Sequence, residues 1–249
     1  MPELSQLWLP CLAALLVGLS KGGLPTIGML AVPVLSLQIS PLQAASLLLP
    51  IFIMTDVVSV YLYRKQFSAY NLKIFIPWGM VGVLVGWATA AYLSERFVGL
   101  LVGLIGLVFV LNVWVRKSHL DTMPRVGPKS HGAVWGVLTG FTSFVSHAGG
   151  PPYQIYVLPQ LLDKMTYVGT TALLFAVINL AKVVPYQMLR PYSSADLMTA
   201  VWLVPAGLAG TLAGAWLTKK IHGLWFFRLV QLGLFLVSVK LVADYFLKG

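Results

Sequence analysis

The sequence predicts an all-α membrane protein that crosses the bilayer several times. Of its 249 residues, 58% are hydrophobic and only 10% are charged, whereas about 25% of the residues in a soluble domain are charged. The apolar residues form runs, most of which are near the roughly 20 residues that a spanning helix needs. The spans that we expect are 42–63, 74–93, 97–115, 167–189, 197–217 and 224–247.

Two further apolar runs, 4–37 and 132–160, are too long for one straight span and contain several glycines and prolines. In the second run, the segment G-G-P-P from Gly149 to Pro152 removes two backbone donors and frees φ at two positions, so a helix should break there. A broken helix is tolerated at membrane depth where it is buried in protein or lines a wet cavity. We therefore expect both runs to be broken, re-entrant helical elements.

The two halves of the chain share this order of elements and also resemble each other in sequence. An offset of 126 residues aligns Ser20 with Ser146, and an offset of 128 aligns the motif P-x-G-x-x-G-x-x-x-G at Pro77 with the same motif at Pro205. The last two glycines of this motif have the GxxxG spacing that lets helices approach closely in lipid. We interpret the motif as a packing feature and the two halves as homologous repeats.

The repeats are predicted to be residues 1–117 and 132–249, joined by a cytoplasmic loop at 118–131. If the broken elements enter and leave on one side of the membrane, the repeats are inverted; if they cross it, the repeats are parallel. The lengths of the broken elements favour the inverted arrangement, which is common among transporters. The positive-inside rule places the loops 64–73 and 116–129 in the cytoplasm under both arrangements.

Charge and motifs exclude several other classes of protein. The formal net charge is +10, but Lys and Arg lie in short clusters between apolar runs, as in cytoplasmic loops, so we do not expect nucleic acid as a partner. Cys11 is the single cysteine, which excludes an internal disulfide and argues against a cysteine metal site. No metalloprotease, nucleophile-elbow, Walker or dinucleotide motif occurs, so the sequence predicts no enzyme, no cofactor and no metal.

Four ionisable residues lie inside the apolar runs: Lys21, Asp56, His147 and Lys182. Such residues are costly in lipid and are candidates for a functional site, although a paired charge can also fix the register of two helices. The offset of 126 residues places Lys21 on His147 and Asp56 on Lys182. We therefore expect the four side chains to meet near the middle of the membrane, in a site of net positive charge that binds an anion.

The residue types suggest how this site would work. Lysine is a compact point charge and suits a small, partly hydrated anion. We interpret Asp56 as a counter-ion, with a proton or Na⁺ site as the alternative, and His147 as a neutral donor or a proton carrier. Backbone N–H groups at a half-helix start could cradle an anion, and polar side chains could donate to it or bond other helices. These further candidates are Ser20, Gly22, Gly23, Ser143, Ser146, Gly149, Gly150, Gln154 and Asn179.

Three segments are similar to a known family. They are S-K-G-G-L-P from Ser20, S-H-A-G-G-P-P-Y-Q-I-Y-V-L-P from Ser146 and V-G-T-T-A-L-L-F-A-V-I-N-L-A-K-V-V-P-Y from Val168. With them, nearly the whole chain resembles the TauE/SafE family of sulfite and organosulfonate exporters. The resemblance implies a carrier in the inner membrane of a bacterium or archaeon, built from two repeats.

From the residues and the resemblance together, we expect a secondary transporter that exports sulfite or a short organosulfonate by alternating access. Its partners would be this small sulfur anion and the lipid bilayer, and a homodimer is left open. One alternative is a proton- or sodium-coupled importer of sulfate, thiosulfate or a carboxylate, and another is an anion channel. A membrane enzyme would need a catalytic constellation that the sequence lacks.

Overall fold

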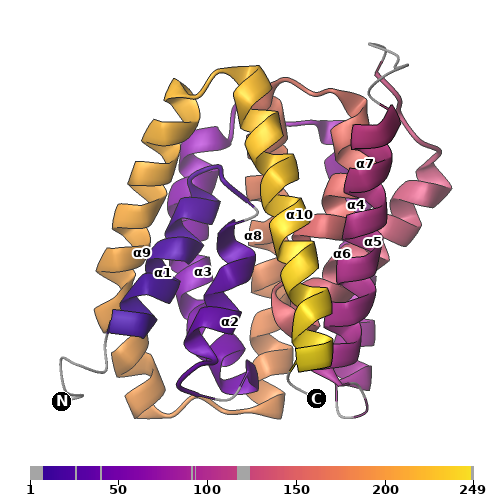
Figure 1. The fold of residues 1–249 in the computed structure, drawn as a ribbon. Helices are drawn as coiled ribbons and strands as arrows, with labels where there is room; N and C mark the ends of the chain where they lie inside the picture. The colour runs from indigo at the N-terminus through magenta and orange to yellow at the C-terminus, as the bar shows by residue number, and fades with distance from the viewer. Residues whose placement is uncertain are drawn as a thin grey trace.

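The computed structural model describes residues 8–25, 27–39, 41–90, 92, 94–116 and 124–247, and these residues form helices and no strand. The elements are α1 (Trp8–Lys21), η2 (Ile27–Leu30), α2 (Ala31–Leu35), α3 (Pro41–Tyr63), α4 (Ala69–Thr89), α5 (Glu95–Arg116), α6 (Lys129–Ser146), α7 (Gly150–Val157), η3 (Leu158–Gln160), α8 (Lys164–Leu189), α9 (Ser194–Lys220) and α10 (Gly223–Leu247) (Figure 1). Some predicted positions lie outside the described residues: 4–7 and 26 of the first broken element, 91 and 93 of the span 74–93, and 118–123 of the connecting loop.

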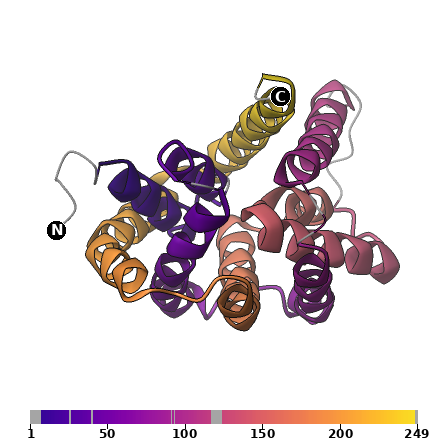
Figure 2. The same cartoon turned by 90° about the horizontal axis from the view of Figure 1, so that it is seen from below.

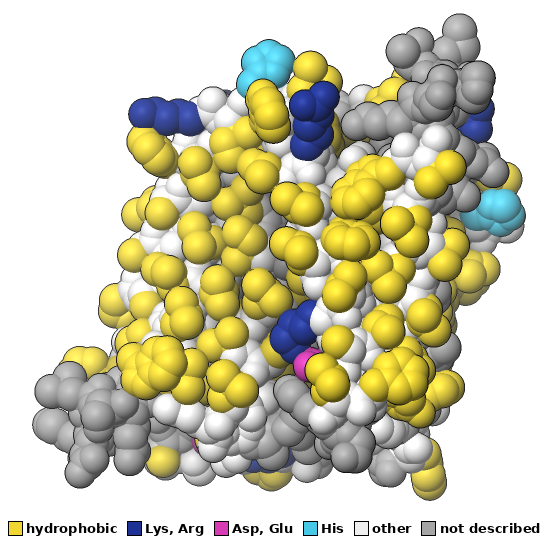
Figure 3. Space-filling model, in the orientation of Figure 1, with side chains coloured by type: hydrophobic (Ala, Val, Ile, Leu, Met, Phe, Trp, Pro, Cys, Tyr) yellow, Lys and Arg dark blue, Asp and Glu magenta, His cyan; other side chains and the backbone are white. Residues whose placement is uncertain are grey.

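The surface of the molecule is that of a multi-pass membrane protein. In the described part of the chain, five helices are long and apolar enough to cross a membrane, namely α3, α4, α8, α9 and α10. Figure 3 shows a flank covered by hydrophobic side chains, with basic and histidine side chains gathered at its upper end, where α9 turns into α10. An apolar flank facing lipid and basic residues at its edge are the expected distribution for such a protein. The all-α, multi-pass class that the sequence predicts is therefore present.

The first broken element reverses direction after α1. Lys21 ends this helix, and Gly23 has φ of +117°, a backbone conformation that glycine adopts without strain. The chain then returns along α1 through η2 and α2, so that Gly28 lies beside the side chain of Ser20. The result is a short helical hairpin.

The second broken element is also a hairpin. Ser146 ends α6, and His147 follows in the left-handed conformation with φ of 54°. The chain then returns through α7. Near the end of α7, the hydroxyl of Tyr156 donates to the carbonyl of Gly127, which precedes α6, at 2.9 Å. Proline at the second and third positions of α7 needs no backbone donor there, which suits a helix start.

Glycines pack the first helix of each hairpin against a helix from the other half of the chain. A Cβ at Gly22, the residue after α1, would lie 2.6 Å from the Cα of Gly214 in α9, so only glycine fits at this crossing. Gly82 of α4 lies in the same way against the backbone of Val137 in α6. The glycines that the sequence assigns to packing lie at these two interfaces. Each hairpin is therefore fixed in place by the opposite half.

The two breaks lie beside the central pair of helices. α3 packs on α8 near the middle of the molecule, while α5 and α10 pack on each other at one edge (Figures 1 and 2). Gly103 and Gly106 of α5 face Ser238 of α10 at this edge. Because α3 and α8 each follow a hairpin in the chain, their inner faces reach both breaks.

Polar caps extend two helices beyond the predicted spans. Ser68 accepts a hydrogen bond from the N–H of Asn71 and starts α4 ahead of the predicted 74, and Asp163 starts α8 ahead of the predicted 167 in the same way. An N-cap oxygen satisfies donors at the first turn of a helix. These helices therefore begin at their caps, before the apolar run begins.

Candidate functional site

A cavity of about 50 Å³ lies where the two breaks meet α3 and α8. Since one water molecule needs about 10–15 Å³ in this measure, the cavity has room for a few waters or one small ion. Several residues that the sequence nominates line it: Ser20, Lys21, Gly23, Ser143, His147, Gly150, Gln154 and Asn179. Five other nominated residues do not line it: Gly22, Asp56, Ser146, Gly149 and Lys182.

Lys21 lies on the cavity wall and forms an ion pair with Asp56 of α3. The distance from Lys21 Nζ to Asp56 Oδ1 is 2.5 Å, and both side chains are almost completely buried. Asn179 of α8 donates to the other carboxylate oxygen at 2.7 Å. The ammonium group also lies over the rings of Phe52 and Phe175, at 5.2 and 5.8 Å from their centroids, an arrangement that stabilises a cation.

His147 and Gln154 offer unpaired polar atoms to the same cavity. The His147 ring stacks on Phe52 with 4.8 Å between the ring centroids, and it lies edge-on to Tyr186. Within the described residues, neither ring nitrogen of His147 and neither amide atom of Gln154 has a hydrogen-bond partner, although both residues are buried. A buried polar atom without a partner costs about 1–3 kcal/mol. A small polar ligand in the cavity would satisfy these atoms.

Lys182 lies behind the cavity wall and acts on the cavity through Ser143. Its side chain is completely buried, and Nζ donates to the carbonyl and the Oγ of Ser143 at 3.0 and 3.1 Å. An ammonium group only donates hydrogen bonds, so the hydroxyl hydrogen of Ser143 stays free for another acceptor. Ser143 itself lines the cavity.

The end of α1 is capped by two side chains of α3. Ser59 donates its hydroxyl to the carbonyl of Lys21 at 2.7 Å, and Tyr63 donates to the carbonyl of Gly22 at 2.6 Å. The last carbonyls of a helix have no partner within the helix. These two hydroxyls therefore replace the water that would otherwise be needed at this buried helix end.

Two side chains of α8 bond the last turn of α6 in a matching arrangement. Lys182 donates to the carbonyl of Ser143, and Tyr186 donates to the carbonyl of Phe144 at 2.7 Å. In each half, the two capping residues are one helical turn apart on the helix that follows the hairpin. The second half uses a lysine where the first half uses Ser59.

The matching contacts give a different alignment of the halves from the sequence offset. By the contacts, Lys182 matches Ser59. Asn179 matches Asp56, because each of these two residues lies seven residues before the capping tyrosine of its helix. The residue of α8 that matches Asp56 by these contacts is therefore Asn179, three residues before the Lys182 that the sequence offset pairs with it. The reason lies at the breaks: α1 ends at its capped residue Lys21, whereas α6 continues for almost one more turn.

The backbone at the breaks also differs from the predicted anion cradle. The N–H groups of Gly22, Gly23 and Ala148 donate to carbonyls in the last turn of the preceding helix. They lie at helix C-termini, where unpaired carbonyls accept such bonds, and are thus occupied. The N–H groups of Gly149 and Gly150, at the start of α7, donate to no such carbonyl.

The hydroxyls of Ser20 and Ser146 stabilise the breaks. Ser20 donates to the carbonyl of Pro25 at 3.3 Å, and Ser146 donates to the carbonyl of Thr142 at 3.3 Å. Neither bond joins two helices, which was the alternative that the sequence left open for these groups. Ser146 therefore contributes to the helix end and lies off the cavity.

The sequence analysis missed the aromatic part of the cavity. Phe52, Phe175 and Tyr153 line it together with Thr171, which donates to the hydroxyl of Tyr153 at 3.3 Å. A signal for two of them was present, because Phe52 lies four residues before Asp56 and Phe175 four before Asn179. Residues at this spacing share one face of a helix.

A cationic cavity at the junction of two broken helices, inside a multi-pass helical protein, defines the class of membrane transporters. The comparison with protein families identifies the family within that class. A model described as "Sulfite exporter TauE/SafE" matches residues 10–241, and the chain belongs to this family, whose members are transporters. No curated protein and no solved structure matches the chain.

Proposed function

We propose that this protein exports a small sulfur oxyanion, either sulfite or a short organosulfonate, which binds in the cavity between the two breaks. One observation carries the proposal. Buried, unpaired donors of His147 and Gln154 face the same small cavity as the ammonium group of Lys21. Membership of the sulfite exporter family then supports a sulfur oxyanion as the ligand.

The contacts available in the cavity suit an ion with several acceptor oxygens. The ammonium group of Lys21, whose charge Asp56 compensates, can supply an N–H donor, and the imidazole of His147 and the amide of Gln154 can each supply another. The hydroxyl of Ser143 supplies another, polarised by the bond that it accepts from Lys182. Donors that are already in place bind an oxyanion without further ordering of side chains, which favours affinity.

We further propose that the two halves are inverted repeats and that the hairpins are re-entrant. The matching caps and matching glycine interfaces support a repeat. In Figure 1, α1 begins near the bottom of the molecule, whereas α6 begins at the upper right, which supports opposite orientations. Transport would then occur by movement of one repeat against the other around the cavity. The basic ends of α3 and α9 would face the cytoplasm.

The test uses two buried glutamines of the second broken element. Gln154→Leu removes the unpaired amide, so we expect equal or higher thermal stability but the loss of most of the stabilisation by sulfite or methanesulfonate. Gln160→Leu is the matched control. Gln160 exchanges hydrogen bonds with Asn71 at 2.8 and 3.0 Å, so its loss should lower stability and leave the stabilisation by the ligand intact.

The measurement is the unfolding temperature of the purified protein in detergent, at constant ionic strength, with chloride as the reference anion. An unchanged ligand effect in Gln154→Leu would contradict the proposed site. No stabilisation by either sulfur oxyanion in the unaltered protein would contradict the proposed substrate. Counterflow of labelled substrate in proteoliposomes then distinguishes a carrier from a channel, since only a carrier exchanges substrate across the membrane in this way.

A further inference from the structure

We propose that Asp56 sets the charge of the substrate, so that the cavity selects a monoanion, such as an organosulfonate or hydrogensulfite, over a dianion such as sulfate. This inference rests on the proposed function and concerns the same cavity. It follows from the number of buried charges around the cavity and from the partner of each.

In the described part of the chain, the buried acidic, basic and histidine side chains near the breaks are few: Lys21, Asp56, His147 and Lys182. At pH 8 a histidine with the ordinary pKa of about 6.5 is neutral. Asp56 compensates the charge of Lys21 at 2.5 Å, whereas the hydrogen bonds of Lys182 go to uncharged oxygens of Ser143. With Lys182 protonated, one positive charge is therefore left over.

A monoanion in the cavity would cancel this remaining charge, whereas a dianion would leave one buried negative charge uncompensated. The monoanion is favoured because removing a dianion from water costs far more, and a single positive charge does not offset that cost. Adding one further unit of positive charge at about 6 Å, with an effective dielectric constant of about 20, shifts the ratio of the two affinities toward the dianion on the order of 100-fold. Removing the charge of Asp56 would give the cavity two uncompensated positive charges and would reverse this preference.

The position of Asp56 allows its charge to be moved without a change of shape. Asn179 donates to Asp56 Oδ2 at 2.7 Å and occupies the matching position on α8. Aspartate and asparagine have nearly the same volume, so exchanging the two residues keeps one carboxylate and one amide in contact. The exchange keeps the total charge, while each single substitution changes it by one unit.

The experiment compares methanesulfonate with sulfate at pH 8, because both present tetrahedral sulfur with oxygens and they differ by one charge. Dissociation constants are measured by calorimetry on detergent-purified protein at constant ionic strength. We expect the unaltered protein to prefer methanesulfonate, and we expect removal of the Asp56 charge to shift the ratio of the two affinities by about 100-fold toward sulfate. Asp56→Asn should prefer sulfate, Asn179→Asp should lose affinity for both anions, and the double exchange should restore the preference for methanesulfonate.

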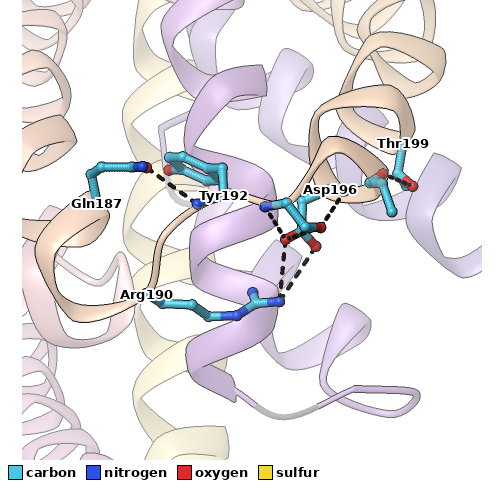
Figure 4. A network of polar contacts seen from close by, with 7 residues as sticks. Gln187, Arg190, Tyr192, Asp196 and Thr199 are labelled. Atoms are coloured by element: carbon cyan, nitrogen blue, oxygen red, sulfur yellow. Dashed lines mark hydrogen bonds and ion pairs between the residues drawn. The ribbon is translucent and has the colours of Figure 1, made fainter.

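Asp196→Asn is the matched control for a change of net charge away from the cavity. Asp196 pairs with Arg190 at 3.3 Å in a network at the start of α9 that also includes Gln187, Tyr192 and Thr199 (Figure 4). This substitution adds the same unit of charge as Asp56→Asn. It should leave the ratio of the two affinities unchanged.

Three results would overturn the inference. These are a preference for sulfate in the unaltered protein, an unchanged ratio in Asp56→Asn, and a ratio in the double exchange that differs from that of the unaltered protein. If Asp56→Asn does not fold, the double exchange and Asn179→Asp still decide the question. Failure of the unaltered protein to bind either anion, or sulfite, would instead refute the proposed function itself.

Discussion

The two breaks are capped in the same way but by different chemistry. At the first, Lys21 is the capped residue that lines the cavity, and a neutral hydroxyl from Ser59 provides the cap. At the second, the capped residue that lines the cavity is Ser143, and Lys182 provides the cap. A buried helix end needs a donor for its last carbonyls, and either side chain meets that need. The fold therefore requires a cap at each break, but it does not require that the cap be charged. The position of the charge is instead set by function.

The largest effect is expected at the glycine interfaces, where the cost of an added carbon depends on whether its neighbour is backbone or side chain. A Cβ at Gly22 would lie 2.5–2.6 Å from backbone atoms of α9, whereas a Cβ at Gly86 would meet the side chain of Phe144 at 3.0 Å. Backbone in a packed helix cannot move aside as a side chain can. We expect Gly22→Ala to cost about 3 kcal/mol or more, and Gly86→Ala about 1 kcal/mol.

Unfolding temperatures of the two glycine variants in detergent test this expectation. Gly223→Ala is the control, because nothing lies within 4 Å of the added carbon there, and it should change stability little. Equal losses at Gly22 and Gly86 would mean that the backbone beside Gly22 moves aside as easily as the side chain of Phe144 beside Gly86, contrary to the expectation.

An intermediate effect, equal in the two halves, is expected at the capping tyrosines. Tyr63→Phe and Tyr186→Phe each leave a buried carbonyl without its hydroxyl donor. The cost should be about 1–3 kcal/mol in each case. Tyr61→Phe, at an exposed position of α3, serves as the control in the same unfolding measurement. A loss of stability in only one of the two capping-tyrosine variants would show that the two breaks are not equivalent.

The smallest effect is expected at Asp163, the N-cap of the helix that carries the second pair of caps. Burial raises the pKa of its carboxyl, but hydrogen bonds from Thr166 and Met165 outweigh this, and the net pKa is lowered. A lowered folded-state pKa contributes stability that is present above the unfolded pKa of about 3.9 and is lost as the pH falls through the folded pKa. The cap should contribute about 1 kcal/mol at neutral pH.

Unfolding measured between pH 3 and 7 tests the role of this cap. Asp163→Asn should remove part of the loss of stability in acid. Ser68→Ala removes the neutral cap of α4 and should lower stability by the same amount at every pH in this range. A steeper loss in acid for Asp163→Asn than for the unaltered protein would contradict the sign of the shift.

The sequence predicts the breaks and the helix packing because glycine and proline act locally. The G-G-P-P segment cannot continue a helix, and the GxxxG glycines have no side chain to separate two helices. The alignment of the halves was harder to predict, because the helices that follow the hairpins match in pattern and not in identity. F-x-x-x-D-x-x-S-x-x-x-Y begins at Phe52, and F-x-x-x-N-x-x-K-x-x-x-Y begins at Phe175. Two of the four positions differ in residue type.

The role of Lys182 could not be predicted from the sequence, since it depends on a contact between distant segments. Ser143, its acceptor, belongs to a different element, and nothing local distinguishes a lysine that caps a helix from one that faces a ligand. The unpaired state of Gln154 is likewise a property of the assembled cavity. A buried charge in the sequence therefore indicates where a site lies, but its direct contacts require the fold.

The glycine crossings between halves also have a consequence for the order of synthesis. α1 leaves the ribosome first, but the helix against which it packs, α9, is among the last to be made. The first hairpin therefore has to wait in the membrane for almost the whole chain, without the surface that holds it. Contacts between such distant segments make folding slow. Neither half made alone would contain a finished cavity, whereas the two halves produced together as separate chains could complete each other.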